Sequence, residues 1–96
     1  MSDFDNIQSL SLYHYRSCPF CVMTTHAIDQ TNLDIELRDI QIEHEHYQAL
    51  VTGAGSTQVP CLLIEKSDGE AHWLFESMDI IAFVQQYAAH LERPAE

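Results

Sequence analysis

Positive charge is scarce in this chain, in which four Lys and Arg residues stand against fifteen Asp and Glu residues for a net charge of −11. A nucleic-acid-binding protein needs a basic patch to neutralise phosphates, so this balance argues against a nucleic-acid partner. It argues against an anionic membrane surface for the same reason. We interpret the acidity mainly as a source of solubility, with selection of basic protein partners as the alternative.

Other features are missing too. No apolar run approaches the ~20 residues needed to span a bilayer, and the N-terminus has neither the basic nor the apolar region of a signal peptide. With three Gly, three Pro and 46% hydrophobic residues, the chain is neither disordered nor fibrous. Its length fits one domain over residues 1–96, with a core of about 9–91 and no repeat or linker.

The chain has three cysteines, and an odd number does not suit the disulfide framework of a secreted protein. We therefore expect a reducing, cytoplasmic environment, and we expect the protein to be a monomer. In such an environment two closely spaced cysteines indicate redox or metal chemistry. Cys18 and Cys21, in the sequence Cys-Pro-Phe-Cys, form such a pair.

Hydrophobic periodicity predicts the order β-α-β-α-β-β-α for an α/β domain. We expect strands over 10–15, 33–38, 60–65 and 71–75, with a hairpin turn over 67–69. Helices are expected over 19–30 and 43–52, and a third is expected after Ser77, with its apolar positions running from Ile80 to Leu91. Gly53 is the expected C-terminal cap of the second helix, and Ser77 is the expected N-cap of the third. The nearly continuous apolar run that follows Pro60 predicts an interior strand.

The position of the cysteine pair favours redox chemistry. Cys18 falls where a strand gives way to a helix, and the unpaired N–H groups and dipole of a helix N-terminus stabilise a thiolate there. The thiolate is the attacking species in disulfide exchange. Cys21 lies one helical turn further on, where it suits the second step, the resolution of a mixed disulfide. Arg16 would add positive charge nearby.

A zinc site is the main alternative for a Cys-x-x-Cys pair, but structural zinc needs a second pair of ligands at similar spacing. His44 and His46 are the nearest candidates, and residues two apart point in different directions on a helix. We therefore expect no metal.

Three ordered motifs resemble the glutaredoxin family over nearly the whole chain. Residues 12–21, Leu-Tyr-His-Tyr-Arg-Ser-Cys-Pro-Phe-Cys, resemble the start of a glutaredoxin, and Val59-Pro60 is similar to the Val-Pro that precedes the third strand in that family. Glu76-Ser77 is similar to the Glu/Gln-Ser pair of glutathione transferase N-terminal domains. The resemblance implies a thioredoxin-like fold with a mixed four-stranded sheet and three helices.

The resemblance also implies a cis bond before Pro60 and glutathione as co-substrate. The backbone of Val59 would pair with the cysteinyl part of glutathione, in the manner of an added strand. Ser77 and the N-terminus of its helix would receive the γ-glutamyl carboxylate, and Glu76 the ammonium group. Phe20 would form a wall beside the sulfur.

Other positions depart from the family pattern. Tyr15 stands where Lys or Arg is frequent, with Arg16 displaced by one, and the resemblance places both near the glycyl carboxylate or the Cys18 sulfur. Gln58 stands where Thr is common, and we expect it and Pro60 to contact glutathione as well. Glu-Ser replaces a Gly-Gly-Cys-Asp stretch. For Cys61 we favour packing in a core strand over an extra redox thiol.

The implied function is a glutathione-dependent thiol–disulfide oxidoreductase that reduces glutathionylated and disulfide-containing proteins. Two alternatives stay open. One is an iron–sulfur carrier whose cluster is held by Cys18 and glutathione between two subunits. The other is a non-catalytic glutathione-binding module whose acidic face recruits a basic partner.

Overall fold

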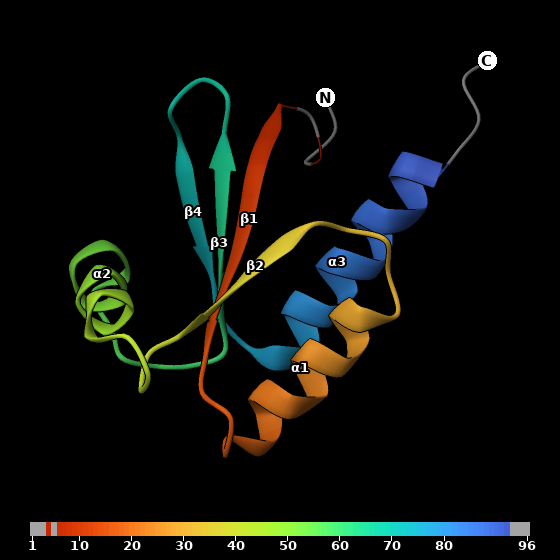
Figure 1. The fold of residues 1–96 in the computed structure, drawn as a ribbon. Coiled ribbons are helices and arrows are strands. Elements are labelled where there is room, and N and C mark those ends of the chain that lie inside the picture. The colour runs from red at the N-terminus through yellow and green to blue at the C-terminus, as the bar shows by residue number, and fades with distance from the viewer. Residues whose placement is uncertain (1–3, 5, 93–96) are drawn as a thin grey trace.

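The computed structural model describes residues 4 and 6–92, and they form the predicted sequence of elements (Figure 1). The strands are β1 (Ile7–His14), β2 (Ile35–Asp39), β3 (Cys61–Lys66) and β4 (Ala71–Leu74). The helices are α1 (Pro19–Asp29), α2 (His44–Ala54) and α3 (Ser77–Glu92).

The strands form one mixed sheet in the order β2-β1-β3-β4. β1 runs parallel to β2 and antiparallel to β3, and β4 returns antiparallel to β3. Helices α1 and α3 pack together on one face of this sheet, and α2 lies alone on the other face (Figure 1). The predicted mixed four-stranded sheet with three helices is confirmed.

The alternation of side chains along β1 divides the core between the two faces of the sheet. Leu10 and Leu12 face α1 and α3 and belong to the larger cluster, whereas Tyr13 belongs to a smaller cluster beneath α2. The buried members of the larger cluster are Leu10, Leu12, Ile28, Leu62, Ile64, Ile80 and Val84. Those of the smaller cluster are Tyr13, Leu50, Cys61 and Leu63. β3 supplies both clusters, as its continuous apolar run predicts.

Most predicted boundaries are off by one or two residues, and β2 begins at Ile35 rather than at residue 33. Three further differences have a clear physical reason. β1 begins at Ile7 rather than at residue 10, because Ile7 pairs with Lys66 of β3 and packs against the larger cluster. Helix α2 runs past Gly53 and ends at Gly55, whose φ of 72° is the left-handed conformation of a C-terminal cap. Ser77 is the first residue of α3 rather than its cap. The carbonyl of Glu76 accepts the N–H of Ile80 at 3.0 Å instead.

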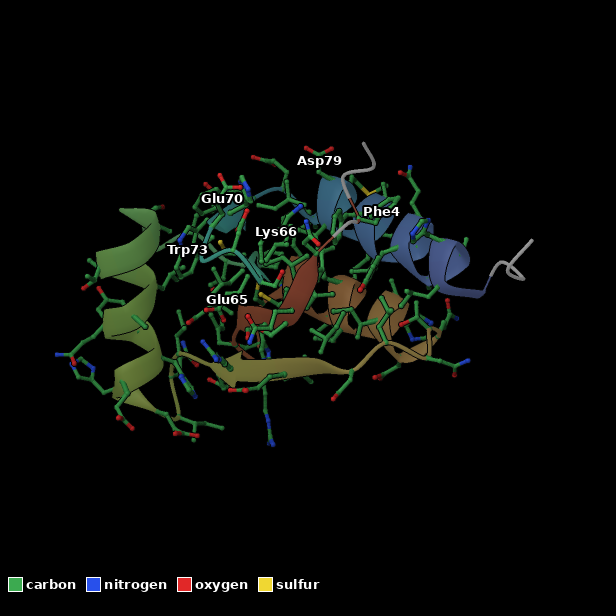
Figure 2. All side chains as sticks on the ribbon, turned by 90° about the horizontal axis from the view of Figure 1, so that it is seen from above. Phe4, Glu65, Lys66, Glu70, Trp73 and Asp79 are labelled. Carbon is green, nitrogen blue, oxygen red and sulfur yellow. The ribbon has the colours of Figure 1, made fainter. Side chains whose placement is uncertain are left out.

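Gly53 stays inside α2 because its bare backbone lies against the ring of Trp73. A Cβ at this position would come within 2.9 Å of Trp73 Cε2. Figure 2 shows Trp73 on the side of the sheet that faces α2. Trp73 and Phe75 both pack against the smaller cluster. None of the helices described in the structure is long and apolar enough to span a bilayer.

Candidate active site at the start of helix α1

Cys18 is the N-cap residue of α1, as its place in the sequence predicts. Its backbone is extended, with φ −80° and ψ 117°, and its carbonyl accepts the N–H of Val22 at 2.9 Å. Its Sγ accepts the N–H of Cys21 at 3.3 Å. Pro19 follows at the first helical position, where a missing N–H costs nothing. The sulfur thus occupies the position of the capping oxygen in most helices, where the helix dipole favours negative charge.

The two cysteines of the motif differ in their surroundings. Cys18 is 6% exposed and Cys21 is 1% exposed, and both are free thiols. Burial, together with a hydrogen bond to Cys18, raises the pKa of the Cys21 thiol to about 12. Cys21 therefore stays protonated near neutrality, which suits a thiol that acts second.

A pocket of about 190 Å³ gathers residues from three separate parts of the chain. One comes from α1, three from the segment before β3, and two from the start of α3. The lining residues are Phe20, Gln58, Val59, Pro60, Glu76 and Ser77. Six of the eight residues that the resemblance assigns to glutathione thus meet in one pocket, next to the turn that carries Cys18. The side chain of Phe20 is 60% exposed and forms an open wall.

Gln58, Val59 and Pro60 of the segment before β3 line this pocket. The Val59–Pro60 peptide bond is cis, as the resemblance implies. Among the described residues, the N–H of Val59 finds no hydrogen-bond partner. A backbone N–H and C=O in this setting can pair with an extended peptide.

The start of α3 forms the opposite part of the pocket lining. Glu76 has a φ of 72°, which L-residues other than Asn and Asp rarely adopt. Its side chain lies near Gln58, whose Nε2 donates to Glu76 Oε1 at 3.4 Å. Ser77 is buried at the first turn of α3, where unpaired N–H groups attract an anion.

Tyr15 and Arg16 are not brought to this pocket. They line a separate one of about 250 Å³, together with Cys21 and residues from β1, α1 and β2. His14 also lines it, although no sequence motif assigns a role to this residue. The signal was available in the alternation of β1, which puts His14 on the same face as Leu10 and Leu12, toward α1.

Cys61 lies away from both pockets, in the smaller cluster. It is 0% exposed, and burial raises the pKa of its thiol to about 12. The predicted packing in a core strand is confirmed. Within residues 4 and 6–92, no group of three or more His, Cys, Asp or Glu is arranged to hold a metal ion.

Comparison with known proteins identifies similar folds and a protein family. No curated protein matches the sequence. The solved thioredoxin-like protein BC3987 is 24% identical, with a TM-score of 0.62 over 82% of this chain and 99% of its own. The trimeric glutathione transferase TDR1 of Leishmania is 23% identical, with a TM-score of 0.67 over 85% of this chain and 18% of its own. These similarities establish the thioredoxin-like fold.

Maleylacetoacetate isomerase from Anaeromyxobacter dehalogenans is 25% identical, with a TM-score of 0.63 over 91% of this chain and 40% of its own. A second structure of that enzyme holds glutathione in its active site and is 26% identical to this chain, with a TM-score of 0.54 over 91% and 42%. The sequence model of the Glutaredoxin family matches residues 10–68, a stretch that includes Cys18, Cys21 and Val59–Pro60. Because this match covers more than half of the 96 residues, the chain belongs to the glutaredoxin family.

Proposed function

We propose that this protein is a glutathione-dependent thiol–disulfide oxidoreductase that reduces glutathionylated and disulfide-containing proteins through Cys18 and Cys21. The observation that carries the proposal is the sulfur of Cys18 at the N-cap of α1, 3.3 Å from the N–H of Cys21. A helix N-terminus stabilises the thiolate that disulfide exchange requires. The glutathione held by the isomerase, a relative 26% identical to this chain, supports glutathione as the ligand.

In this proposal glutathione binds in the pocket of about 190 Å³. Its γ-glutamyl carboxylate would lie at the N-terminus of α3, near Ser77, because that end of the helix is positive. Its ammonium group would lie near the carboxylate of Glu76. The backbone of Val59 would pair with the cysteinyl residue, which would direct the glutathione sulfur toward α1. Phe20 and Pro60 supply apolar walls, and Gln58 holds Glu76.

Tyr15 and Arg16 do not line the proposed glutathione pocket. They line the pocket of about 250 Å³ that Cys21 also lines. Arg16 is exposed and is one of four basic residues in a chain of net charge −11. Its positive charge would attract the glycyl carboxylate of an approaching glutathione molecule. Tyr15 would lie beside it at the edge of the site.

The reaction needs only thiols and disulfides. The Cys18 thiolate attacks the glutathione sulfur of a glutathionylated protein, so an S–S bond forms to glutathione and the protein thiolate leaves with the electron pair. The thiolate of a second glutathione then attacks this adduct, which releases glutathione disulfide and restores Cys18. On a dithiol substrate, Cys21 attacks Cys18 instead, and two glutathione molecules reduce the resulting Cys18–Cys21 disulfide. The cytosolic glutathione pool is a suitable reductant for glutaredoxins.

A coupled assay tests the function. The protein is mixed with glutathione, glutathione reductase, NADPH and the mixed disulfide of glutathione with 2-mercaptoethanol, and NADPH loss is followed. We expect Cys18→Ser to abolish turnover and Cys21→Ser to retain much of it. Equal turnover by Cys18→Ser and the parent would refute the proposal. Glutathione binding without turnover would indicate an interaction module, and a coloured, cluster-loaded dimer after anaerobic purification would indicate an iron–sulfur carrier.

A further inference from the structure

Cys21 lines a pocket that is separate from the one proposed for glutathione. This pocket of about 250 Å³ lies between the loop after β1, the first turns of α1 and the strand β2. It has room for several water molecules. Its lining residues include His14, Arg16, Cys21 and Asp29.

His14 is the imidazole that shares this pocket with the Cys21 thiol. It is the last residue of β1, half-buried, and its register partner in the parallel strand β2 is Asp39. The carboxylate of Asp39 is fixed, because its Oδ1 accepts the N–H groups of Gln41 at 2.8 Å and Ile42 at 3.1 Å. The fold therefore holds an imidazole, a fixed carboxylate and the second thiol of the motif at one end of the sheet.

The charges around His14 come from every element packed against it. Asp39 faces it from β2, Arg16 from the loop after β1, and Cys21 and Asp29 from α1. Burial lowers the pKa of His14, Asp39 raises it, and Arg16 lowers it again, with burial the largest effect. The imidazole is therefore neutral near pH 7 and can accept a proton.

Cys21 needs such an acceptor. Burial, together with the hydrogen bond to Cys18, raises the pKa of its thiol to about 12 in the reduced protein, so the thiol is protonated near pH 7. The proton of Cys21 must leave when its sulfur attacks Cys18.

We propose that His14 is the proton acceptor for Cys21, through a water molecule of their shared pocket, when Cys21 resolves a mixed disulfide on Cys18. The inference rests on the proposed function and concerns its second step. His14 takes the thiol proton as Cys21 Sγ attacks Cys18 Sγ. The Cys18–Cys21 bond forms, the bond from Cys18 to the substrate sulfur breaks, and the substrate thiolate leaves with the electron pair. The imidazolium then returns the proton to solvent.

The two steps separate in the reaction of the reduced protein with one equivalent of the aromatic disulfide DTNB. Attack by Cys18 releases a first coloured thiolate, and attack by Cys21 on the adduct releases a second. Stopped-flow absorbance measures both phases. Cys21→Ser is the control that retains only the first phase. His72→Gln, on the exposed part of β4, is the matched histidine control.

We expect His14→Gln to leave the first phase unchanged and to slow the second about 100-fold at pH 7. From about pH 7 to pH 9, the second phase of the parent should be nearly constant, since His14 is already neutral. In His14→Gln it should rise about tenfold per pH unit, as the thiolate fraction of Cys21 does. A merely structural role for His14 would not produce this difference in pH profile.

His14→Ala is the second variant, and it leaves space that free imidazole can fill. Restoration of the second phase by added imidazole supports proton transfer. A second phase that is the same in His14→Gln and the parent at every pH overturns the inference, as does a slow second phase in folded His14→Ala that imidazole does not restore. If the parent lacks the first phase, Cys18 is not a nucleophile, and the proposed function fails together with this inference.

Discussion

The backbone N–H of Cys21 donates a hydrogen bond to the sulfur of Cys18 at 3.3 Å, so the second cysteine of the motif helps to cap the helix that begins at the first. The two sulfur atoms differ in their surroundings. The Cys18 sulfur receives a backbone dipole, whereas the Cys21 thiol is buried and its pKa is raised to about 12. One turn of helix thus holds two thiols in unequal surroundings.

Alkylation should distinguish the three cysteines of the native protein. Cys21 and Cys61 both have a pKa of about 12 and are 1% and 0% exposed, so their thiolates are rare and covered. We expect iodoacetamide near pH 7 to modify Cys18 alone, and all three cysteines once the chain is denatured. Peptide mass spectrometry identifies the sites. Labelling of Cys61 at the rate of Cys18 in the native protein would contradict the assignment.

Alkaline pH should destabilise the protein through Cys61. The folded chain holds this thiol protonated up to about pH 12, while the unfolded chain releases its proton at the ordinary value of 9.0. The stabilising effect is therefore complete below pH 9 and is lost as pH rises toward 12. Between about pH 8 and pH 10, the parent should lose about 1.4 kcal/mol more unfolding free energy than Cys61→Ala.

Urea denaturation at the two pH values measures this difference. The comparison with Cys61→Ala removes the contributions of Cys21, tyrosine and lysine, which titrate in both proteins. Removal of the sulfur also affects packing, but equally at both values of pH. Identical losses in the two proteins would show that Cys61 does not contribute.

Gly53→Ala should destabilise the contact between α2 and the sheet. An added Cβ meets the ring of Trp73, with Cε2 at 2.9 Å and Cη2 at 3.0 Å, so the helix or the indole must move. We expect a loss of about 1–2 kcal/mol, because overpacking outweighs the gain in helix propensity. Fluorescence reports the movement directly, since Trp73 is the chain's single tryptophan.

Gly55→Ala is the matched control. Gly55 has a φ of 72° and nothing within 4 Å of the added Cβ. Its substitution should cost about 1 kcal/mol through backbone strain and leave the native fluorescence of Trp73 unchanged. An emission change in Gly55→Ala but not in Gly53→Ala would contradict the packing described.

Ser77→Ala should weaken the use of glutathione. If the γ-glutamyl carboxylate lies at the start of α3, loss of the hydroxyl group removes one hydrogen bond to a charged group, and the KM for glutathione should rise about tenfold. The kcat should change little, because this bond is made equally in the ground and transition states. Ser67→Ala, in the exposed turn between β3 and β4, should leave KM unchanged. An unchanged KM in Ser77→Ala would place the carboxylate elsewhere.

Local pattern predicted the fold and the position of Cys18 because both depend on neighbouring residues. Periodicity identified each strand and helix, and the strand-to-helix transition placed Cys18 at a cap. The start of β1 was missed because Ile7 alone is apolar in the Ile-Gln-Ser stretch, and its pairing partner Lys66 is far away in sequence. The sequence around Gly53 favours a C-terminal cap, whereas the contact with Trp73 that keeps Gly53 inside α2 is tertiary.

The family motifs predicted the site residues that belong to them, but not the positions of the other residues. The motifs indicated the six residues of the pocket beside α1, and they assigned Tyr15 and Arg16 to the glycyl carboxylate or the Cys18 sulfur. These two residues line the pocket that Cys21 also lines, a placement that depends on the path of the loop after β1. Glu76 has a positive φ that no local preference of glutamate predicts. His14 and Cys21 line one pocket because β1 and α1 pack in the same cluster.

The most direct test of the function is to locate the glutathione adduct. Reduced Cys21→Ser protein, which cannot resolve a mixed disulfide on Cys18, is treated with glutathione disulfide near pH 7 and mapped by peptide mass spectrometry without reduction. We expect one glutathione per chain, attached to Cys18, and none on Cys61. An adduct on Cys61, or no adduct under conditions that modify free cysteine, would contradict the assignment of Cys18 as the nucleophile.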